Sequence, residues 1–482
     1  MSDPQTDTTA MTEAGEQPPA PPNNAKLTRG SITGHLVGQT LPGIVGVAAI
    51  MSIGLVDAYF IGKLGSAELA AISFIFPISV ALSSLGVGVM VGINSVVSRA
   101  LGAGDDAKAA RRANFGIVFA VITGLALGTL LFLALDPLFS LMNAPENLRP
   151  IIGAYMRPFA FGFPLLLAIM GFNGVLRGQG EARRTSMVSI SYAAANWILD
   201  PVLITGTPDF LFGSFEGFGI VGAAYATIIG WVIGILVAIA LVRKTAIPLD
   251  LSLLRGTNLL DPARAILRVA GPAAFSNAIN PIGLSVLTAL VASAGQDAVA
   301  GFGAAGRLQS FAVVPLLALS GAIGAIVGQN WGAREYGRAR TAALYAGLFC
   351  LGYGFVTAIV LASAGEWFAD LFTDKPEVIA EFALYLEIAA WGYAGFGILI
   401  VANGILNAIG KASFALGQSI ARVFLVMLPV AWLLQPAWGS AAIYTGELLA
   451  NAFGALSGAA LVWWVFHRRS PDNSRAAAAK PA

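Results

Sequence analysis

The chain has 482 residues, of which 57% are hydrophobic and 11% are charged, and its formal net charge is +2 at pH 7. A water-soluble domain with a mean hydropathy of +0.76 would expose a very large apolar surface, so these values exclude that class and indicate a polytopic membrane protein. The single cysteine, Cys350, excludes a disulfide framework and a cysteine-based metal site. Basic residues are scattered through short loops, so no nucleic-acid partner is expected.

Both ends of the chain have the composition of tails. Residues 1–33 are rich in Pro, Thr, Ala and acidic residues, and we expect a disordered tail there and over 467–482. Between them, apolar segments separated by charged or Gly/Pro-rich turns predict twelve membrane-spanning helices. The predicted spans are 34–62, 67–101, 110–138, 149–176, 185–206, 219–243, 265–293, 298–329, 339–364, 377–409, 413–435 and 440–466. Lys and Arg gather in alternate loops, which predicts that both termini lie on the cytoplasmic side of the membrane.

The two halves of the chain resemble each other. A shift of 230 residues aligns matching residues without a gap, including Pro42 with Pro272, Gly65 with Gly295, Gly102 with Gly332, Asn173 with Asn403, and Gly180 with Gly410. We therefore expect an all-α protein with two six-helix lobes, over 34–243 and 265–466, joined by a cytoplasmic linker over 244–264. Because six is an even number of spans, the lobes are parallel and related by a pseudo-two-fold axis along the membrane normal.

Two acidic residues lie inside predicted spans of the first lobe. Asp57 is the sole acid of the first span, and Asp200 follows Asn196 by four residues in the fifth, which places both on one helical face. An acid at the centre of a membrane helix costs about 2.5–3.5 kcal/mol, so such acids point to function. Under the 230-residue shift they fall on Leu287 and Val430, which favours an ion site in the N-terminal lobe alone. The alternative for Asp57 is a position at the lipid–water boundary.

Several polar residues are candidates for the walls of the same cavity. Asn173 and Thr227 are expected to hydrogen-bond near the two acids, although Asn173 equally suits a contact that holds two helices together and Thr227 a bond to its own backbone. Asn277 and Asn280, beside Pro281, place two amides and a helix breaker in the seventh span. They either line the substrate route or pack between helices.

The sequence lacks several catalytic motifs. It contains neither a Walker-type lysine loop nor a His-Glu-x-x-His motif, so neither an enzyme nor a bound cofactor is expected. Arg307 and Arg422 fall inside predicted helices of the second lobe, where each either reaches toward the membrane interface or meets a charged substrate.

Five segments together resemble the multidrug and toxic compound extrusion family. They are Val56 to Gly65, Leu176 to Gly180, Leu199-Asp200-Pro201, Gly222 to Thr227, and Gly328 to Ala333. The resemblance covers residues 34 to 466 and implies a secondary transporter that exports organic cations and other drugs in exchange for protons or sodium. It assigns ion coupling to Asp57, Asn196 and Asp200, and cavity positions to Asn173 and Thr227. Asn280 and Phe396 stand where NorM-like members carry acids, which resembles the DinF-like bacterial branch.

The combined expectation is a monomeric, cation-coupled exporter of amphipathic organic compounds in the lipid bilayer. Protons are the favoured coupling ion, and Na⁺ would bind at Asp57, Asp200 and Asn196. A lipid-linked flippase of the same superfamily is one alternative, and it would need a cationic cavity, for which the first lobe offers no buried arginine. A passive channel and a membrane-embedded enzyme are the others.

Overall fold

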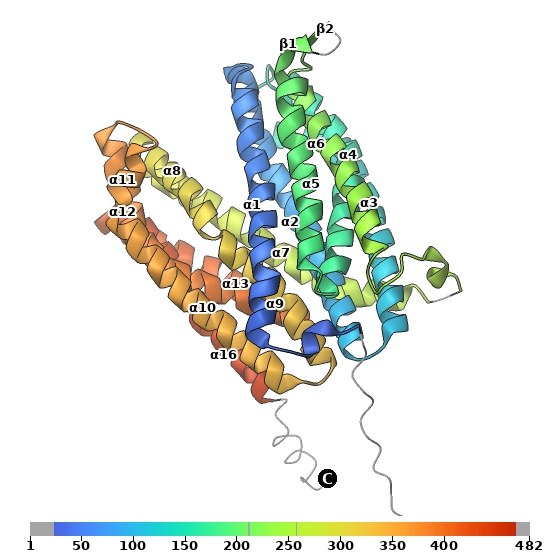
Figure 1. Ribbon diagram of the computed structural model, residues 1–482. Coiled ribbons are helices and arrows are strands. Elements are labelled where there is room, and N and C mark those ends of the chain that lie inside the picture. The colour runs from blue at the N-terminus through green and yellow to red at the C-terminus, as the bar shows by residue number, and fades with distance from the viewer. Residues whose placement is uncertain (1–23, 211–212, 257, 469–482) are drawn as a thin grey trace, which may run out of the picture.

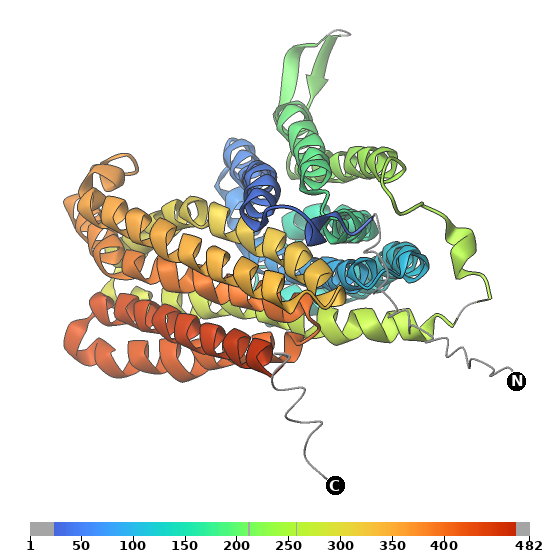
Figure 2. The same cartoon turned by 60° about the horizontal axis from the view of Figure 1, so that its bottom comes forward.

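The computed structural model describes residues 24–210, 213–256 and 258–468. Within these ranges twelve helices are long and apolar enough to cross a membrane, which confirms the predicted number. The helices form two lobes that diverge toward one end and meet at the other (Figure 1). Viewed after rotation, the blue-to-green helices and the yellow-to-red helices remain two separate groups, except that α7 runs beneath the first lobe (Figure 2).

The N-terminal lobe is built from six long helices. Helix α1 begins where the Ser31 hydroxyl oxygen accepts a hydrogen bond from the Gly34 N–H at 3.2 Å, and α3 begins where Asp105 Oδ1 accepts one from the Lys108 N–H at 2.9 Å. Both are N-caps that satisfy otherwise unpaired backbone donors. The helices are α1 (Ile32–Gly62), α2 (Ser66–Gly102), α3 (Asp106–Leu141), α4 (Arg149–Gly178), α5 (Ala182–Asp200) and α6 (Ile220–Val242).

A β-hairpin that the sequence did not predict separates α5 from α6. The fifth span continues beyond Asp200 as a π-helical segment, η2 (Pro201–Thr205), in which Pro201 provides no N–H for the regular α-helical pattern. Strands β1 (Gly206–Phe210) and β2 (Gly213–Glu216) follow and pair antiparallel. The hairpin stands at the end where the lobes diverge (Figure 1).

The C-terminal lobe has more interrupted helices than predicted. The eighth span was predicted as one helix over 298–329, and this is wrong, because it breaks at Val313, just before Pro315. After a short turn, η3 (Leu251–Leu254), the elements are α7 (Leu260–Val291), η4 (Ala292–Ala294), α8 (Gln296–Ala312), α9 (Val314–Gly332), α10 (Tyr336–Ser363), α11 (Gly365–Asp370), α12 (Pro376–Ala389), η5 (Ala390–Gly392), α13 (Tyr393–Ala408), α14 (Ala412–Ile420), the π-helical η6 (Ala421–Met427), α15 (Leu428–Trp438) and α16 (Ser440–His467).

Backbone conformation repeats between the lobes. Gly180 and Gly410, aligned by the 230-residue shift, both end a helix with positive φ, +72° and +78°. Gly219 and Gly439 precede the sixth helix of each lobe with φ of 61° and 60°, and they stand 220 positions apart. The separation between equivalent residues falls from 230 to 220 because, among the described residues, the β-hairpin lies in the first lobe alone. These left-handed conformations favour glycine, which explains the residue type at both equivalent positions.

Glycines bring the two lobes together at the closed end. A Cβ atom on Gly102 would lie 1.9 Å from the carbonyl oxygen of Gln329, and one on Gly332 would lie 2.2 Å from that of Arg99. These two glycines are equivalents in the repeat, so they meet across the axis that relates the lobes. Only a residue without a side chain permits this backbone-to-backbone approach.

The end of the predicted N-terminal tail is ordered. The prediction of disorder is wrong for residues 24–33, because η1 (Lys26–Thr28) packs against both lobes, and Leu27 is buried with Ile326 and Phe466. The Leu27 N–H donates to Gln329 Oε1 at 3.0 Å, and Gln329 Nε2 donates to the Gly178 carbonyl at 2.9 Å. The segment therefore links the two lobes where they meet. His467 and Arg468, also predicted as tail, are instead the last residue and the C-cap of α16. Residues 1–23 and 469–482 lie outside the described residues.

Candidate functional site

Asp57 and Asp200, far apart in sequence, meet between α1 and α5. The carboxyl group of Asp57 lies close enough to the Asp200 carboxyl group and the Asn196 side chain to interact with both, although no hydrogen bond between them is found among the described residues. Asp57 is half-buried, whereas Asp200 and Asn196 are fully buried. The sequence-based pairing of these three residues in one site matches this arrangement.

The oxygen atoms of this cluster lack hydrogen-bond donors. Asp57 Oδ1, Asn196 Oδ1 and both carboxylate oxygens of Asp200 are buried and accept no hydrogen bond from the described protein atoms. Buried acceptors without partners are costly, and two neighbouring carboxylates repel each other when both are ionised. A proton or a small cation held between these oxygens would remove both costs.

Close packing of α1 and α5 holds the acids together. A Cβ on Gly46 would lie 3.1 Å from the Ser186 Cα, so a larger residue would push the helices apart. The Ser186 hydroxyl donates to the Pro42 carbonyl at 2.5 Å. Near the acids, Trp197 Nε1 donates to the Ser52 hydroxyl at 3.1 Å. These contacts set the register in which Asp57 faces Asp200.

Two further side chains complete the surroundings of the pair. Asn196 Nδ2 donates to the hydroxyl of Thr227, on α6, at 3.4 Å, so Thr227 contacts the cluster through Asn196. Tyr155, on α4, is buried and lies close enough to both carboxyl groups for their charges to act on it. Tyr155 was not a candidate from sequence, because aromatic residues are common throughout the chain.

Asn173 does not belong to this cluster. It lies on the same continuous helix as Tyr155 but five turns further on, a separation of about 27 Å along the axis. Asn173 is buried, and its neighbour Gly174 packs against Met90 and Ile93 of α2. The expectation that Asn173 reaches the acids is therefore wrong, and the alternative of a helix-packing residue fits its position.

A second set of polar residues lines two adjoining cavities between the lobes. A cavity of about 180 Å³ is bordered by Asn277, Asn280 and Arg177, and one of about 500 Å³ by Asn280, Arg422 and Glu447. Asn280 and Phe396 border both cavities, so the two are neighbours. The structure thus places Asn277 and Asn280 on the inter-lobe route and not beside Asp57 and Asp200.

Three ionisable groups border these cavities. Glu447, on α16, is buried, so the second lobe also contains a buried acid, which the sequence analysis did not single out. The sequence pattern that could have identified Glu447 is the same as for Asp57, namely a lone acid in an apolar span. Arg177 borders the cavity from the first lobe, although it was assigned to a cytoplasmic loop, and Arg422 is buried while Arg307 is exposed.

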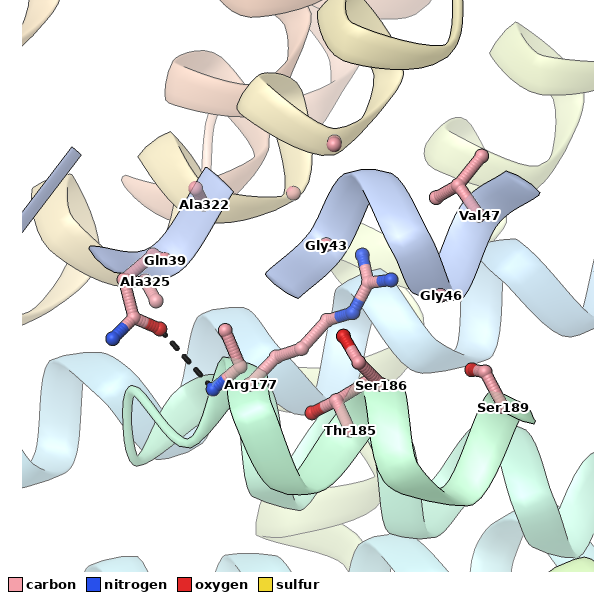
Figure 3. A pocket seen from close by; sticks show the side chains of 13 residues that line it. Gln39, Gly43, Gly46, Val47, Arg177, Thr185, Ser186, Ser189, Ala322 and Ala325 are labelled. Atoms are coloured by element: carbon pink, nitrogen blue, oxygen red, sulfur yellow. Dashed lines mark hydrogen bonds between the residues drawn. The ribbon is translucent and has the colours of Figure 1, made fainter. Parts of the chain in front are cut away.

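Arg177 also borders a smaller space at the closed end. This cavity, of about 20 Å³, is large enough for one water molecule. Figure 3 shows the Arg177 side chain extending from the end of α4 toward Gly43 and Gly46 of α1. Its Nη1 atom lies 2.4 Å from where a Cβ on Gly321 of α9 would be, so the lack of a side chain at Gly321 accommodates the guanidinium.

Twelve apolar helices in two repeated lobes around a central cavity define a multi-pass membrane transporter. The MatE family model matches the chain twice, over residues 42–202 and 272–433. The chain belongs to the multidrug and toxic compound extrusion (MATE) family. The two matches begin 230 residues apart, which confirms the repeat predicted from sequence.

Relatives of this chain include transporters with different names. A protein of Shewanella oneidensis named FAD transporter is 34% identical over 400 residues, covering 82% of this chain and 86% of the relative. Bacillus subtilis YoeA, named a probable multidrug resistance protein, is 26% identical, covering 80% of this chain and 83% of its own. The crystal structure of a mutant of the Vibrio cholerae MATE transporter VcmN has a TM-score of 0.84 and 30% identity, covering 91% of this chain and 96% of its own.

Proposed function

We propose that this chain is a secondary active exporter of small organic compounds, driven by the entry of H⁺ or Na⁺. The observation that carries the proposal is the Asp57–Asp200 pair, with its four buried, unpartnered oxygens including that of Asn196. A cation bound there offsets the free-energy cost of the unpartnered oxygens and of the repulsion between the two carboxylates. Release of the cation restores this cost. Linkage then requires the cation and the exported compound to favour different states of the protein.

The proposed orientation places both termini in the cytoplasm of a bacterial cell, with the protein acting as a monomer in the inner membrane. The closed end, where Gly102 meets Gln329, then faces the cytoplasm, and the wider cavity opens outward. In this state Asp57 would receive a cation from outside. Rocking of the two lobes about the closed end would carry the substrate across, in the manner of parallel-repeat transporters.

The experiment is ethidium transport in proteoliposomes under separately imposed pH and Na⁺ gradients. The variants Asp57→Asn and Asp200→Asn keep the side-chain volume and remove the charge. We expect each to abolish gradient-driven transport, while an Asn173→Ala control, remote from the pair, retains it. Full transport by both Asp variants would refute the coupling role, and transport indifferent to either gradient would support a channel instead.

A second candidate function is export of flavin nucleotides. The observation in its favour is the 34% identity to a relative named FAD transporter, over 82% of this chain. Transport of FAD and ethidium by the same proteoliposomes, each with and without the gradient, discriminates between the two substrates. A lipid-linked flippase is the less favoured alternative because these two relatives are named FAD transporter and probable multidrug resistance protein.

A further inference from the structure

The inter-lobe cavities contain more positive than negative charge. Arg177 borders the smaller cavity and Arg422 the larger one, whereas Glu447 is the single carboxylate among the residues that border either. None of the ion pairs found among the described residues includes either arginine. Two guanidinium groups and one carboxylate thus face a route proposed to carry organic compounds.

Arg422 has unused hydrogen-bonding capacity. Its side chain is 95% buried, since its exposed fraction is 5%. Nη1 donates to Asn280 Oδ1 and Nη2 to Asn451 Oδ1, both at 2.6 Å, while Nε has no partner. A guanidinium has five N–H groups, so these contacts use two and neutralise no charge. A buried cation held by neutral amides is suited to an anionic partner.

Glu447, by contrast, has donors within reach of both oxygens. Its Oε1 accepts from Gln309 Nε2 at 2.8 Å. The Tyr385 hydroxyl lies 3.1 Å from Glu447 Oε2 and 2.9 Å from Gln309 Oε1, so its single proton is shared between these two acceptors. The carboxylate would repel an anion in the cavity, so Arg422 acts against this repulsion, and removing the Glu447 charge should strengthen anion binding.

The wall near Arg422 suits a flat aromatic group. Phe396 lies beneath the guanidinium, with 5.4 Å between the Arg422 Cζ and the ring centroid. Phe76 and Pro77, from α2 of the other lobe, border the same cavity, and Phe76 is 65% exposed. Aromatic and proline surfaces favour planar ligands by dispersion and stacking. The volume of about 500 Å³ falls in the range of cavities that hold drug-sized molecules.

We propose that this cavity is a binding site for planar aromatic compounds that carry a phosphate or another compact anionic group, with Arg422 as the residue that binds the anion. This inference rests on the proposed function, because it names the class of compound exported. Phe396 and Phe76 contact the aromatic part of the ligand. Arg177, toward the closed end, provides a second positive charge for a ligand with a further anionic group.

The test compares FMN with riboflavin, which share one ring system and differ by a phosphate. Binding to the purified full-length protein is followed by flavin fluorescence. We expect FMN to bind about tenfold or more tightly than riboflavin, and Arg422→Gln to remove that difference while leaving riboflavin unchanged. Glu447→Gln, which retains a group able to accept hydrogen bonds, should tighten FMN binding. The exposed Arg307→Gln is the matched control and should behave like wild type.

Two outcomes would overturn the inference. One is equal affinity of the wild type for FMN and riboflavin, and the other is an FMN preference that survives in Arg422→Gln. If Arg422→Gln does not fold, Glu447→Gln still decides, because unchanged FMN affinity there contradicts the proposed charge balance. Failure of ion coupling is distinguishable, because Asp57→Asn should lose gradient-driven ethidium transport yet keep the preference for FMN over riboflavin, since linkage to the cation affects both flavins alike.

Discussion

Gly102→Ala should shift the protein away from the state described here. The added Cβ would lie 1.9 Å from the Gln329 carbonyl oxygen and 2.9 Å from the Gln329 Cα. Both are backbone atoms, so no side-chain rotation relieves the clash, and the lobes must separate at the closed end. Overpacking of this kind costs about 1–3 kcal/mol. In an equilibrium between two states, that amounts to a change of about 5- to 150-fold in their ratio.

The assay is maleimide labelling of a cysteine at the closed end. Cys350→Ala removes the single native thiol, and Ala325→Cys introduces one at a residue that is 2% exposed and borders the small cavity of Figure 3. In otherwise unaltered protein we expect slow labelling from the side of the membrane on which Leu27 lies. Adding Gly102→Ala should increase the labelling rate, because the lobes part more often.

Gly271→Ala provides the matched control. Gly271 is also helical and lies on α7, which packs against α2, but a Cβ there would meet no atom within 4 Å. Both substitutions add the same methyl group to a glycine within a helix, and the two sites differ in the backbone atoms that this group would meet. Equal labelling rates in the Gly102→Ala and Gly271→Ala proteins, with both monodisperse, would refute the argument that glycine contacts keep this end closed.

Two other predictions concern local contacts. Leu27→Ala should lower the free energy of unfolding by about 2–4 kcal/mol, because Leu27 is 1% exposed between the lobes. Lys26→Ala, which breaks only a partly exposed ion pair with Glu181, should cost less than about 1 kcal/mol, and equal melting temperatures in detergent would contradict this ranking. Thr227→Val should slow gradient-driven ethidium transport about two- to tenfold by removing the acceptor for Asn196, while Thr227→Ser should not. Similar rates in these two variants would show that the hydroxyl has no role.

Sequence alone determined the membrane class, the number of spans and the repeat. Apolar segments of sufficient length are a local property of the chain, and a membrane requires them to be helices, so no tertiary information was needed. The pairing of Asp57 with Asp200 was also predictable, because a lone acid in an apolar span needs a partner and few residues were available. Applied equally to α16, the same reasoning would have identified Glu447.

The tertiary structure decided which polar groups face one another. Asn173 and Tyr155 share a helix, yet only packing shows that Tyr155 lies at the level of the acids. Arg177 follows the fourth apolar span and was assigned to a loop, but contact between the lobes encloses it beside Gly321. Arg422 and Asn280 are 142 residues apart, and their contact depends on how α7 packs beside η6. Helical periodicity predicts the face of a residue within its own helix, whereas the neighbour of that face depends on the packing of all the helices.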